Sequence, residues 1–147
     1  MYVPPYDALL RSIGTSREAL EGASEVSVPM SLFRFLVQIA VANGDFNEAG
    51  YLQANPDVAE AVRRGEIENG RLHYIGFGYF EGRQGATPEV DERWYLRSYP
   101  DVGSAVRAGQ LSSATEHFMV VGASEGRSPS VHYENDAAQW KKALRAA

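Results

Sequence analysis

The chain has 147 residues, of which 44% are hydrophobic, and this length and composition fit one globular domain or two small units that share a core. Its 19 acidic and 14 basic residues give a net charge of −5, which argues against a broad nucleic-acid surface because such a surface needs a basic face. The absence of cysteine excludes disulfide bonds, thiolate metal ligands and a cysteine nucleophile.

The amino-terminal segment, residues 1–44, is predicted to contain helices that act as a cap or as a degenerate repeat. Its first residues, MYVPPYDALLRSIG, lack the basic and apolar regions of a secretory signal peptide. Thr15 and Glu18 have the spacing of a capping box before a short helix. The stretch SLFRFLVQIAVA, residues 31–42, is too short for a membrane span, so we expect a core helix there. We expect a soluble, cytoplasmic protein, with export without an amino-terminal signal as the alternative.

A repeat with a period of 44 residues is the clearest feature of the sequence. The segment YLQANPDVAEAVRRG, which starts at Tyr51, returns without a gap as YLRSYPDVGSAVRAG, which starts at Tyr95. A period of this size is typical of helical units that stack because one unit cannot bury its own apolar face. We therefore predict an all-α protein in which two three-helix repeats stack in one compact domain, with a helical segment before them and a helix after them. The predicted boundaries are 1–44, 45–88, 89–130 and 131–147.

Each repeat is predicted to contain three short helices, the first at about 47–54 and 91–98. Asn55 is the predicted N-cap of the second helix, followed by Pro56 at its first position and Asp57 near its positive end. Gly65 and Gly82 are expected to end the second and third helices in the left-handed conformation. The equivalent positions in the second repeat are Tyr99, Pro100, Asp101, Gly109 and Gly126.

Glycines also lie inside the predicted third helix, at Gly78 and Gly122. Because glycine costs about 1 kcal/mol inside a helix relative to alanine, its presence in both copies predicts the close approach of another helix. Ser113 and Glu116 have the spacing of a capping box at the start of the third helix of the second repeat. Asp136 is the predicted start of the carboxy-terminal helix.

The segments YLQANPDVAEAV…LHYIGFGYFEGR and WYLRSYPDVGSAV…EHFMVVGASEGRSP resemble a bacterial tandem repeat with the signature YL…NPDV…H-aromatic…G…EGR-x-P. The resemblance covers about residues 46–130. Copies of this kind are similar to segments of large exported or surface-associated bacterial proteins and to segments beside glycosyltransferase domains. The resemblance implies an accessory module. This sequence departs from the signature at Tyr99, which replaces the asparagine, and at Gly85, which replaces the final proline. The signature residues are Pro56, Asp57, His73, Gly82, Pro100, Asp101, His117 and Gly126.

The two repeat histidines, His73 and His117, have two interpretations. Metal binding or proton transfer would need converging partners, and no HxxxH or HxxE motif accompanies either histidine. We favour a half-buried ring that forms a hydrogen bond within the repeat, and Asp57 and Asp101 are the expected partners.

The Glu-Gly-Arg triplets at 81–83 and 125–127 allow a similar choice. A catalytic glutamate would need a partner group and a perturbed environment, which the sequence does not show. We favour a structural role in which the arginine binds the last helix carbonyls or a carboxylate of the neighbouring repeat. The sequence also has no phosphate-binding glycine loop, nucleophile elbow or calcium loop, so we predict no enzyme activity, no metal and no cofactor.

The two repeats differ most in the third helix, where Phe77, Tyr79 and Phe80 correspond to Val121, Ala123 and Ser124. These aromatic residues either pack against the apolar stretch 31–42 or form a binding surface, since aromatic residues and arginine dominate binding hot spots.

We therefore expect a non-catalytic protein-interaction or scaffold module, accessory to bacterial machinery that makes or exports surface glycan. The alternative is a carbohydrate-binding module that uses the same aromatic residues. A protein partner is expected, a glycan or a second copy is a further candidate, and neither nucleic acid nor membrane insertion is expected. The predicted contact residues are Tyr79, Phe80, Arg83, Trp94 and Arg127.

Overall fold

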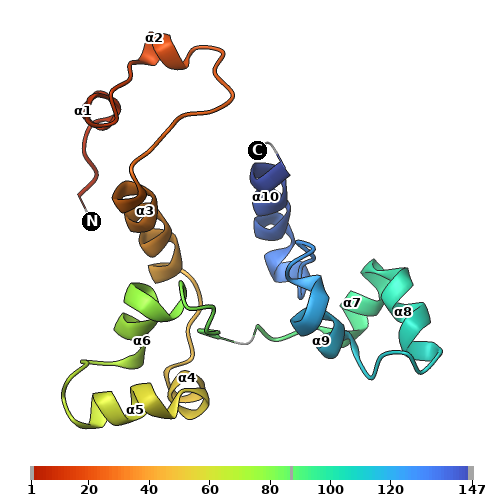
Figure 1. Cartoon of the computed structure of the whole chain (residues 1–147). Coiled ribbons are helices and arrows are strands. Elements are labelled where there is room, and N and C mark those ends of the chain that lie inside the picture. Colours follow the sequence, from red (N-terminus) through yellow and green to blue (C-terminus); the bar gives the residue numbers. More distant parts are fainter. Residues whose placement is uncertain (1, 87, 146–147) are drawn as a thin grey trace. The chain divides into compact units, whose positions relative to one another are not determined.

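A computed structural model describes residues 2–86 and 88–145. These residues form helices, turns and irregular segments without any β-strand, which confirms the predicted all-α class. The chain divides into two compact units, residues 1–87 and 88–147, and each unit is described by itself (Figure 1). Within the described residues, no helix combines the length and the hydropathy that crossing a membrane requires.

The described residues of unit 1, 2–86, form six α-helices and one π-helical turn, η1, that continues directly from the last of them. In Figure 1, helices α4, α5 and α6 lie together, in yellow to green. The elements of this unit are α1 (Tyr6–Ser12), α2 (Arg17–Leu20), α3 (Met30–Ala42), α4 (Glu48–Ala54), α5 (Pro56–Arg63), α6 (Gly70–His73) and η1 (Tyr74–Gly78).

Helix α2 begins one residue later than the predicted capping box requires. The N-cap is Ser16, whose hydroxyl oxygen accepts a hydrogen bond from the Ala19 N–H at 3.3 Å. Hydrogen bonds to its own backbone N–H and from Ser16 lower the pKa of Glu18. The predicted pairing of Thr15 with Glu18 is therefore wrong, because the neighbouring serine takes the capping position.

Helix α3 differs from the core helix that its composition predicts. None of its 13 residues is buried, and Phe33 and Phe35 are 51% and 55% exposed. The helix contacts η1, where Arg34 donates a hydrogen bond to the Gly76 carbonyl at 2.6 Å. Because apolar residues occur around most of the helix while the contact lies along one side, the prediction of a buried helix is wrong.

Helices α4 and α6 begin at asparagine caps, and the second and third repeat helices end at glycines. Asn47 and Asn69 accept capping hydrogen bonds from Gly50 and Leu72 at 3.0 Å and 2.8 Å. Asn55 stands at the predicted N-cap of α5, but its side chain forms no capping bond and instead donates to the Tyr51 carbonyl at 2.8 Å. The helices end as predicted at two glycines in the left-handed conformation, Gly65 (φ 72°) and Gly82 (φ 77°).

Unit 2 repeats this order, and from α7 to η2 every boundary lies 44 residues after its equivalent in unit 1. Gly109 and Gly126 again have positive φ values, of 72° and 69°. Asp91 caps α7 through the Trp94 N–H at 2.9 Å. The elements are α7 (Glu92–Ser98), α8 (Pro100–Arg107), α9 (Ala114–His117), η2 (Phe118–Gly122), η3 (Val131–Tyr133) and α10 (Glu134–Arg145).

Two predictions about helix starts in unit 2 need correction, namely the partner of the Glu116 carboxylate and the first residue of α10. Ser113 caps α9 as expected and accepts from the Glu116 N–H at 3.0 Å. The Glu116 carboxylate, however, accepts from the Ser112 N–H at 2.7 Å, so only half of the capping box is present. Helix α10 begins at Glu134, two residues before Asp136, because the 3₁₀ turn η3 leads directly into it.

The core of each unit is built around a tyrosine from its first repeat helix. In unit 2, Tyr95, Val102, Ala114 and Phe118 form one buried cluster. In unit 1 the buried apolar residues among those described are Leu10, Tyr51 and Val58. Burying a large apolar side chain stabilises a fold by about 1.5–3 kcal/mol, so these few residues account for much of the stability of each repeat.

Candidate functional site

Each repeat contains a buried tyrosine that forms a hydrogen bond with the repeat histidine. Tyr51 is 1% exposed, and its hydroxyl oxygen lies 2.9 Å from Nδ1 of His73. Burial raises the pKa of Tyr51. The histidine therefore bonds within its repeat, as expected, but the predicted partner, Asp57, is wrong because that carboxylate binds Arg83 instead.

The second repeat has the same pair with tighter burial. Tyr95 is 0% exposed, and its hydroxyl oxygen lies 3.0 Å from Nδ1 of His117. Burial raises the pKa of Tyr95 to about 12, so the phenol is neutral throughout the physiological range. Asp101, the predicted partner of His117, binds Arg127 instead.

Glycine is required where the tyrosine hydroxyl meets the third repeat helix. A Cβ atom on Gly78 would overlap the Tyr51 hydroxyl, and one on Gly122 would overlap the Tyr95 hydroxyl. The helix has a π-helical turn here, in which the Tyr79 N–H donates to the Tyr74 carbonyl at 2.9 Å. The predicted close approach is thus made by a tyrosine side chain and not by the backbone of another helix.

The signature arginine of each repeat bridges two carboxylates of its own unit. Arg83 binds both oxygens of Asp57, at 3.0 Å and 2.9 Å, and Glu81 at 2.7 Å. It also donates to the Asn55 side-chain carbonyl at 2.9 Å. The hydrogen bond from Arg83 holds the pKa of Asp57 below its ordinary value. The predicted bridge is therefore present, but it lies within a repeat and does not reach a neighbouring one.

In unit 2 the same bridge joins Arg127 to Asp101 at 3.0 Å and 2.7 Å and to Glu125 at 2.6 Å. The hydrogen bond from Arg127 lowers the pKa of Asp101 to about 2. The guanidinium carbon also lies 4.9 Å from the centre of the Tyr99 ring, and the Tyr99 hydroxyl accepts from the Ser128 N–H at 2.9 Å. Asn55 accepts a hydrogen bond from the arginine of unit 1, whereas Tyr99, at the equivalent position, contacts the arginine of unit 2 through its ring and accepts a hydrogen bond from Ser128.

A glutamate at the start of each first helix holds the start of the third helix. Glu48 accepts from the backbone N–H groups of Gly70 and Arg71, at 2.6 Å and 3.0 Å. Glu92 accepts from the N–H groups of Ala114 and Thr115, both at 2.9 Å. Although burial acts to raise the pKa of Glu92, its hydrogen bonds lower it overall. This contact was not predicted from the sequence, although the 44-residue spacing of the two glutamates was a signal for it.

Unit 1 exposes an aromatic surface that we define by Phe77, Tyr79 and Phe80. These side chains are 61%, 45% and 36% exposed. Arg34 of α3 stacks on the Phe80 ring, with its guanidinium carbon 4.0 Å from the ring centre. The packing interpretation is therefore partly right, since α3 contacts η1 beside the aromatic surface and still leaves much of it exposed, while the binding interpretation stays a prediction.

Trp94, the predicted contact residue at the start of unit 2, is half-buried. Its ring lies edge-on to the Tyr99 ring, with the two ring centres 6.1 Å apart, and it packs against the buried cluster around Tyr95. The signature prolines Pro56 and Pro100 lie at the first position of α5 and α8, as expected. Among the five predicted contact residues, Tyr79 and Phe80 are therefore the most accessible.

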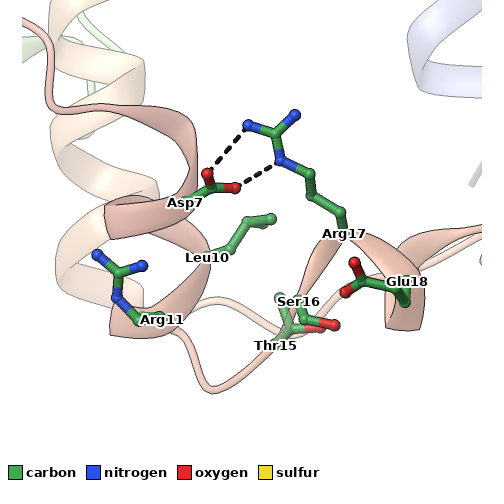
Figure 2. A pocket seen from close by; sticks show the side chains of 7 residues that line it. All are labelled: Asp7, Leu10, Arg11, Thr15, Ser16, Arg17 and Glu18. Atoms are coloured by element: carbon green, nitrogen blue, oxygen red, sulfur yellow. Dashed lines mark hydrogen bonds and ion pairs between the residues drawn. The ribbon is translucent and has the colours of Figure 1, made fainter.

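A hollow of about 300 Å³ lies between α1 and α2 (Figure 2). Arg17 binds both carboxylate oxygens of Asp7 at its edge, at 2.5 Å and 3.1 Å, while buried Leu10 lies between the two helices. The hydrogen bond from Arg17 lowers the pKa of Asp7. The ion pair between these opposite charges therefore joins α1 to α2 at the edge of the hollow.

A second hollow, of about 380 Å³, lies in unit 2 between the end of η2 and helix α10. Its walls include Phe118 and Ala123 on one side and Trp140 and Leu144 on the other. The aliphatic stem of Lys141 lies against Gly126. Helix α10 thus contacts the end of the second repeat at Gly126, while Trp140 and Leu144 remain 60% and 71% exposed.

The part of the chain that the structure describes contains no group of three or more histidine, aspartate or glutamate side chains that could hold a metal ion. Comparisons with protein-family models, with curated proteins and with solved structures found no match to this chain. The geometry of the two units is therefore the basis for the functional argument.

Proposed function

We propose that the chain is a non-catalytic protein-interaction module in which the two repeats serve as a scaffold and unit 1 provides the binding surface. The observation that carries the proposal is the aromatic surface of unit 1, with Tyr79 45% and Phe77 61% exposed. Exposed aromatic residues grouped on one rigid element are typical of interaction sites. Helix α3 extends the apolar character of this unit through Phe33 and Leu36, which are 51% and 48% exposed.

The internal contacts support different roles for the five predicted contact residues. Tyr79 and Phe80 bind the partner, because their side chains are the accessible ones. Arg83 and Arg127 are held by carboxylates of their own units, and their side chains are 26% and 18% exposed. Each arginine therefore has a supporting role within its own unit. Trp94 packs against Tyr99 and supports the second repeat.

The resemblance of the repeats to segments beside glycosyltransferase domains suggests the kind of assembly that the module serves. We propose that it docks on a larger bacterial machine that makes or exports surface glycan. An interaction module in such a machine needs a rigid surface and no reaction chemistry of its own.

The test is affinity capture of the tagged chain from lysate and envelope fractions of the organism that encodes it. The variant Tyr79→Ala/Phe80→Ser takes its new residues from unit 2, so both fit the repeat. We expect one stoichiometric protein that this variant loses and that the matched control Val120→Ala/Val121→Ala retains. Equal recovery with all three chains would contradict the proposal, provided that circular dichroism shows all three folded.

Carbohydrate binding is the second candidate, because the exposed rings of Phe77 and Tyr79 offer flat apolar faces on which a sugar could stack. Calorimetric titration with envelope polysaccharides tests it. Saturable heat that Tyr79→Ala abolishes would favour this function over the first. No heat with any polysaccharide would remove it.

A further inference from the structure

Asparagine is followed by glycine at two places in the sequence, Asn43-Gly44 and Asn69-Gly70. In such a pair the backbone nitrogen of the glycine can attack the side-chain amide carbon of the asparagine, because glycine has no Cβ atom to obstruct the approach. The two pairs share the same reacting groups. A difference between their reactivities therefore reports their folded surroundings.

Asn43 lies at the exposed carboxy-terminal end of α3, and Gly44 is exposed as well. The side-chain amide nitrogen of Asn43, which is the potential leaving group, donates to the Ile39 carbonyl at 2.7 Å. The Gly44 N–H donates to the Val41 carbonyl at 3.1 Å. Both bonds belong to the last turn of a helix, where fraying costs little free energy. Fraying therefore frees the attacking and the leaving nitrogen together and exposes both to water.

Asn69 is held in place as the N-cap of α6. Its side-chain oxygen accepts from the Leu72 N–H at 2.8 Å, and the N–H of buried Gly70 donates to the Glu48 carboxylate at 2.6 Å. The attack requires a glycine nitrogen that has lost its proton, and a neighbouring carboxylate disfavours that anion because like charges repel. The fold therefore restrains both reacting groups at Asn69.

We propose that Asn43-Gly44 is a site of spontaneous deamidation and that the fold protects Asn69-Gly70 from the same reaction. The Gly44 nitrogen loses its proton to solvent and forms a bond to Cγ of Asn43. The bond from Cγ to Nδ2 then breaks, and the nitrogen leaves as ammonia after taking a proton from solvent. Water opens the cyclic succinimide at either carbonyl to give aspartate or isoaspartate. The net reaction consumes one water, releases one ammonium ion and leaves a carboxylate in place of the amide.

The new carboxylate forms where α3 is attached to the repeat. Arg71 of α6 donates to the Ala42 carbonyl at 2.8 Å and so joins the end of α3 to the third repeat helix. A negative charge at the carboxy-terminal end of a helix opposes the helix dipole. It also gives Arg71 a charged acceptor that competes with the Ala42 carbonyl. Deamidation therefore weakens the last turn of α3.

Peptide mapping by mass spectrometry tests the proposal on the full chain, incubated in mildly alkaline buffer in which it stays folded. We expect Asn43 to deamidate at least about tenfold faster than Asn69, because the hydrogen bond to a charged carboxylate restrains Gly70. In concentrated urea the two rates should become similar, since the unfolded chain keeps both Asn-Gly pairs and loses their hydrogen bonds. An unmodified Asn43, equal rates in the folded chain, or a rate difference that persists in urea would each overturn the inference.

Two variants separate the site from its protection. Gly44→Ala should slow the reaction at Asn43 at least about tenfold, because the methyl group obstructs the attacking geometry. The variant fits the fold, since the new Cβ atom would lie 3.4 Å from the Val41 carbonyl oxygen. Glu48→Gln keeps an acceptor oxygen without the charge, so it should speed the reaction at Asn69 and leave Asn43 unchanged. An unchanged rate at Asn69 would reject the protective role of the carboxylate, and the comparison in urea tests that role if Glu48→Gln fails to fold.

The effect on α3 has its own measurement. Asn43→Asp reproduces the charge of the product, and Asn43→Gln is the neutral control. We expect amide hydrogen exchange in the last turn of α3 to be faster in Asn43→Asp than in Asn43→Gln. Equal exchange in the two variants would reject the weakening of α3.

Discussion

The two copies of the repeat agree in their interior and differ on their outside. Both copies have a tyrosine–histidine hydrogen bond, an arginine bound to two carboxylates and a glutamate at the start of the third helix. The differences lie at the exposed end of the third helix, where three aromatic residues of unit 1 correspond to Val121, Ala123 and Ser124 of unit 2. Because unit 2 folds the same way without them, the aromatic residues are not needed to form the repeat.

The two copies also provide different contacts to the guanidinium group of their signature arginine. Asn55 gives Arg83 a side-chain carbonyl, whereas Tyr99 gives Arg127 the face of a ring and binds Ser128 through its hydroxyl. Burial is more complete around the second arrangement, since Tyr95 and Phe118 are 0% and 6% exposed. The repeat therefore tolerates two solutions at one position as long as the arginine remains paired.

The largest expected effect comes from Gly78→Ala, which places a methyl group on the Tyr51 hydroxyl. Overpacking of this kind costs about 1–3 kcal/mol, and we expect the upper end because a backbone-attached atom cannot move aside. Gly76→Ala is the matched control, since its Cβ would meet open space and alanine favours a helix. Urea denaturation measures both variants.

The double variant Gly78→Ala/Tyr51→Phe sharpens this result. Without the hydroxyl, the nearest ring atom lies 3.3 Å from the new Cβ atom, so part of the lost stability should return. A double variant that is less stable than Gly78→Ala alone would show that the tyrosine hydroxyl is not the obstacle.

The next effect is that of removing each tyrosine hydroxyl separately. Tyr51→Phe and Tyr95→Phe each remove a hydrogen bond to a histidine, which costs about 1 kcal/mol. We expect Tyr95→Phe to be the more damaging because its surroundings exclude water more completely. Thermal unfolding of the two variants compares them, and a larger loss in Tyr51→Phe would reverse the assignment of the tighter core to unit 2.

The smallest effect is the pH dependence of the Asp101 bridge. The pKa of Asp101 is about 2 in the folded chain and about 3.9 for a free aspartate, so the bridge stabilises the fold above pH 4. This contribution disappears as the pH falls toward 2. Because the carboxylate is 61% exposed, solvent screening limits it to about 1 kcal/mol or less.

Chemical denaturation between pH 6 and pH 2 tests this with Asp101→Asn, which should be less stable at pH 6 and should lose less stability on acidification. Ser104→Ala, on the same helix and outside the bridge, is the control. Identical pH profiles for Asp101→Asn and the wild-type chain would refute the role of the bridge.

The local parts of the fold could be predicted from sequence. Asn47, Asp91, Pro56 and the glycines at 65 and 82 act through neighbouring backbone atoms, so the helix boundaries followed from them. The side-chain partners could not be predicted in the same way. His73 had two aspartates, three tyrosines and five glutamates within residues 45–88, and only the three-dimensional path of the helices selects Tyr51.

The candidate site shows the same limit. The sequence identified Tyr79 and Phe80 as the residues that distinguish the repeats, but hydrophobicity alone could not indicate which faces are covered. Helix α3 demonstrates this, because its apolar composition predicts burial and the structure leaves Phe33 and Phe35 about half exposed. The arginines were predicted as partner contacts and as bridges to helix carbonyls or to a carboxylate of the neighbouring repeat, and the structure pairs them with carboxylates of their own units.

The contacts that tie each repeat together also determine how quickly it can form. The tyrosine–histidine pair joins residues 22 positions apart, and the arginine–aspartate pair joins residues 26 apart. Such short separations give a low contact order, which goes with folding in microseconds to milliseconds. The first repeat has all of these residues by Arg83 and needs none from the second for them. During synthesis it can therefore complete these contacts while the second repeat is still being translated.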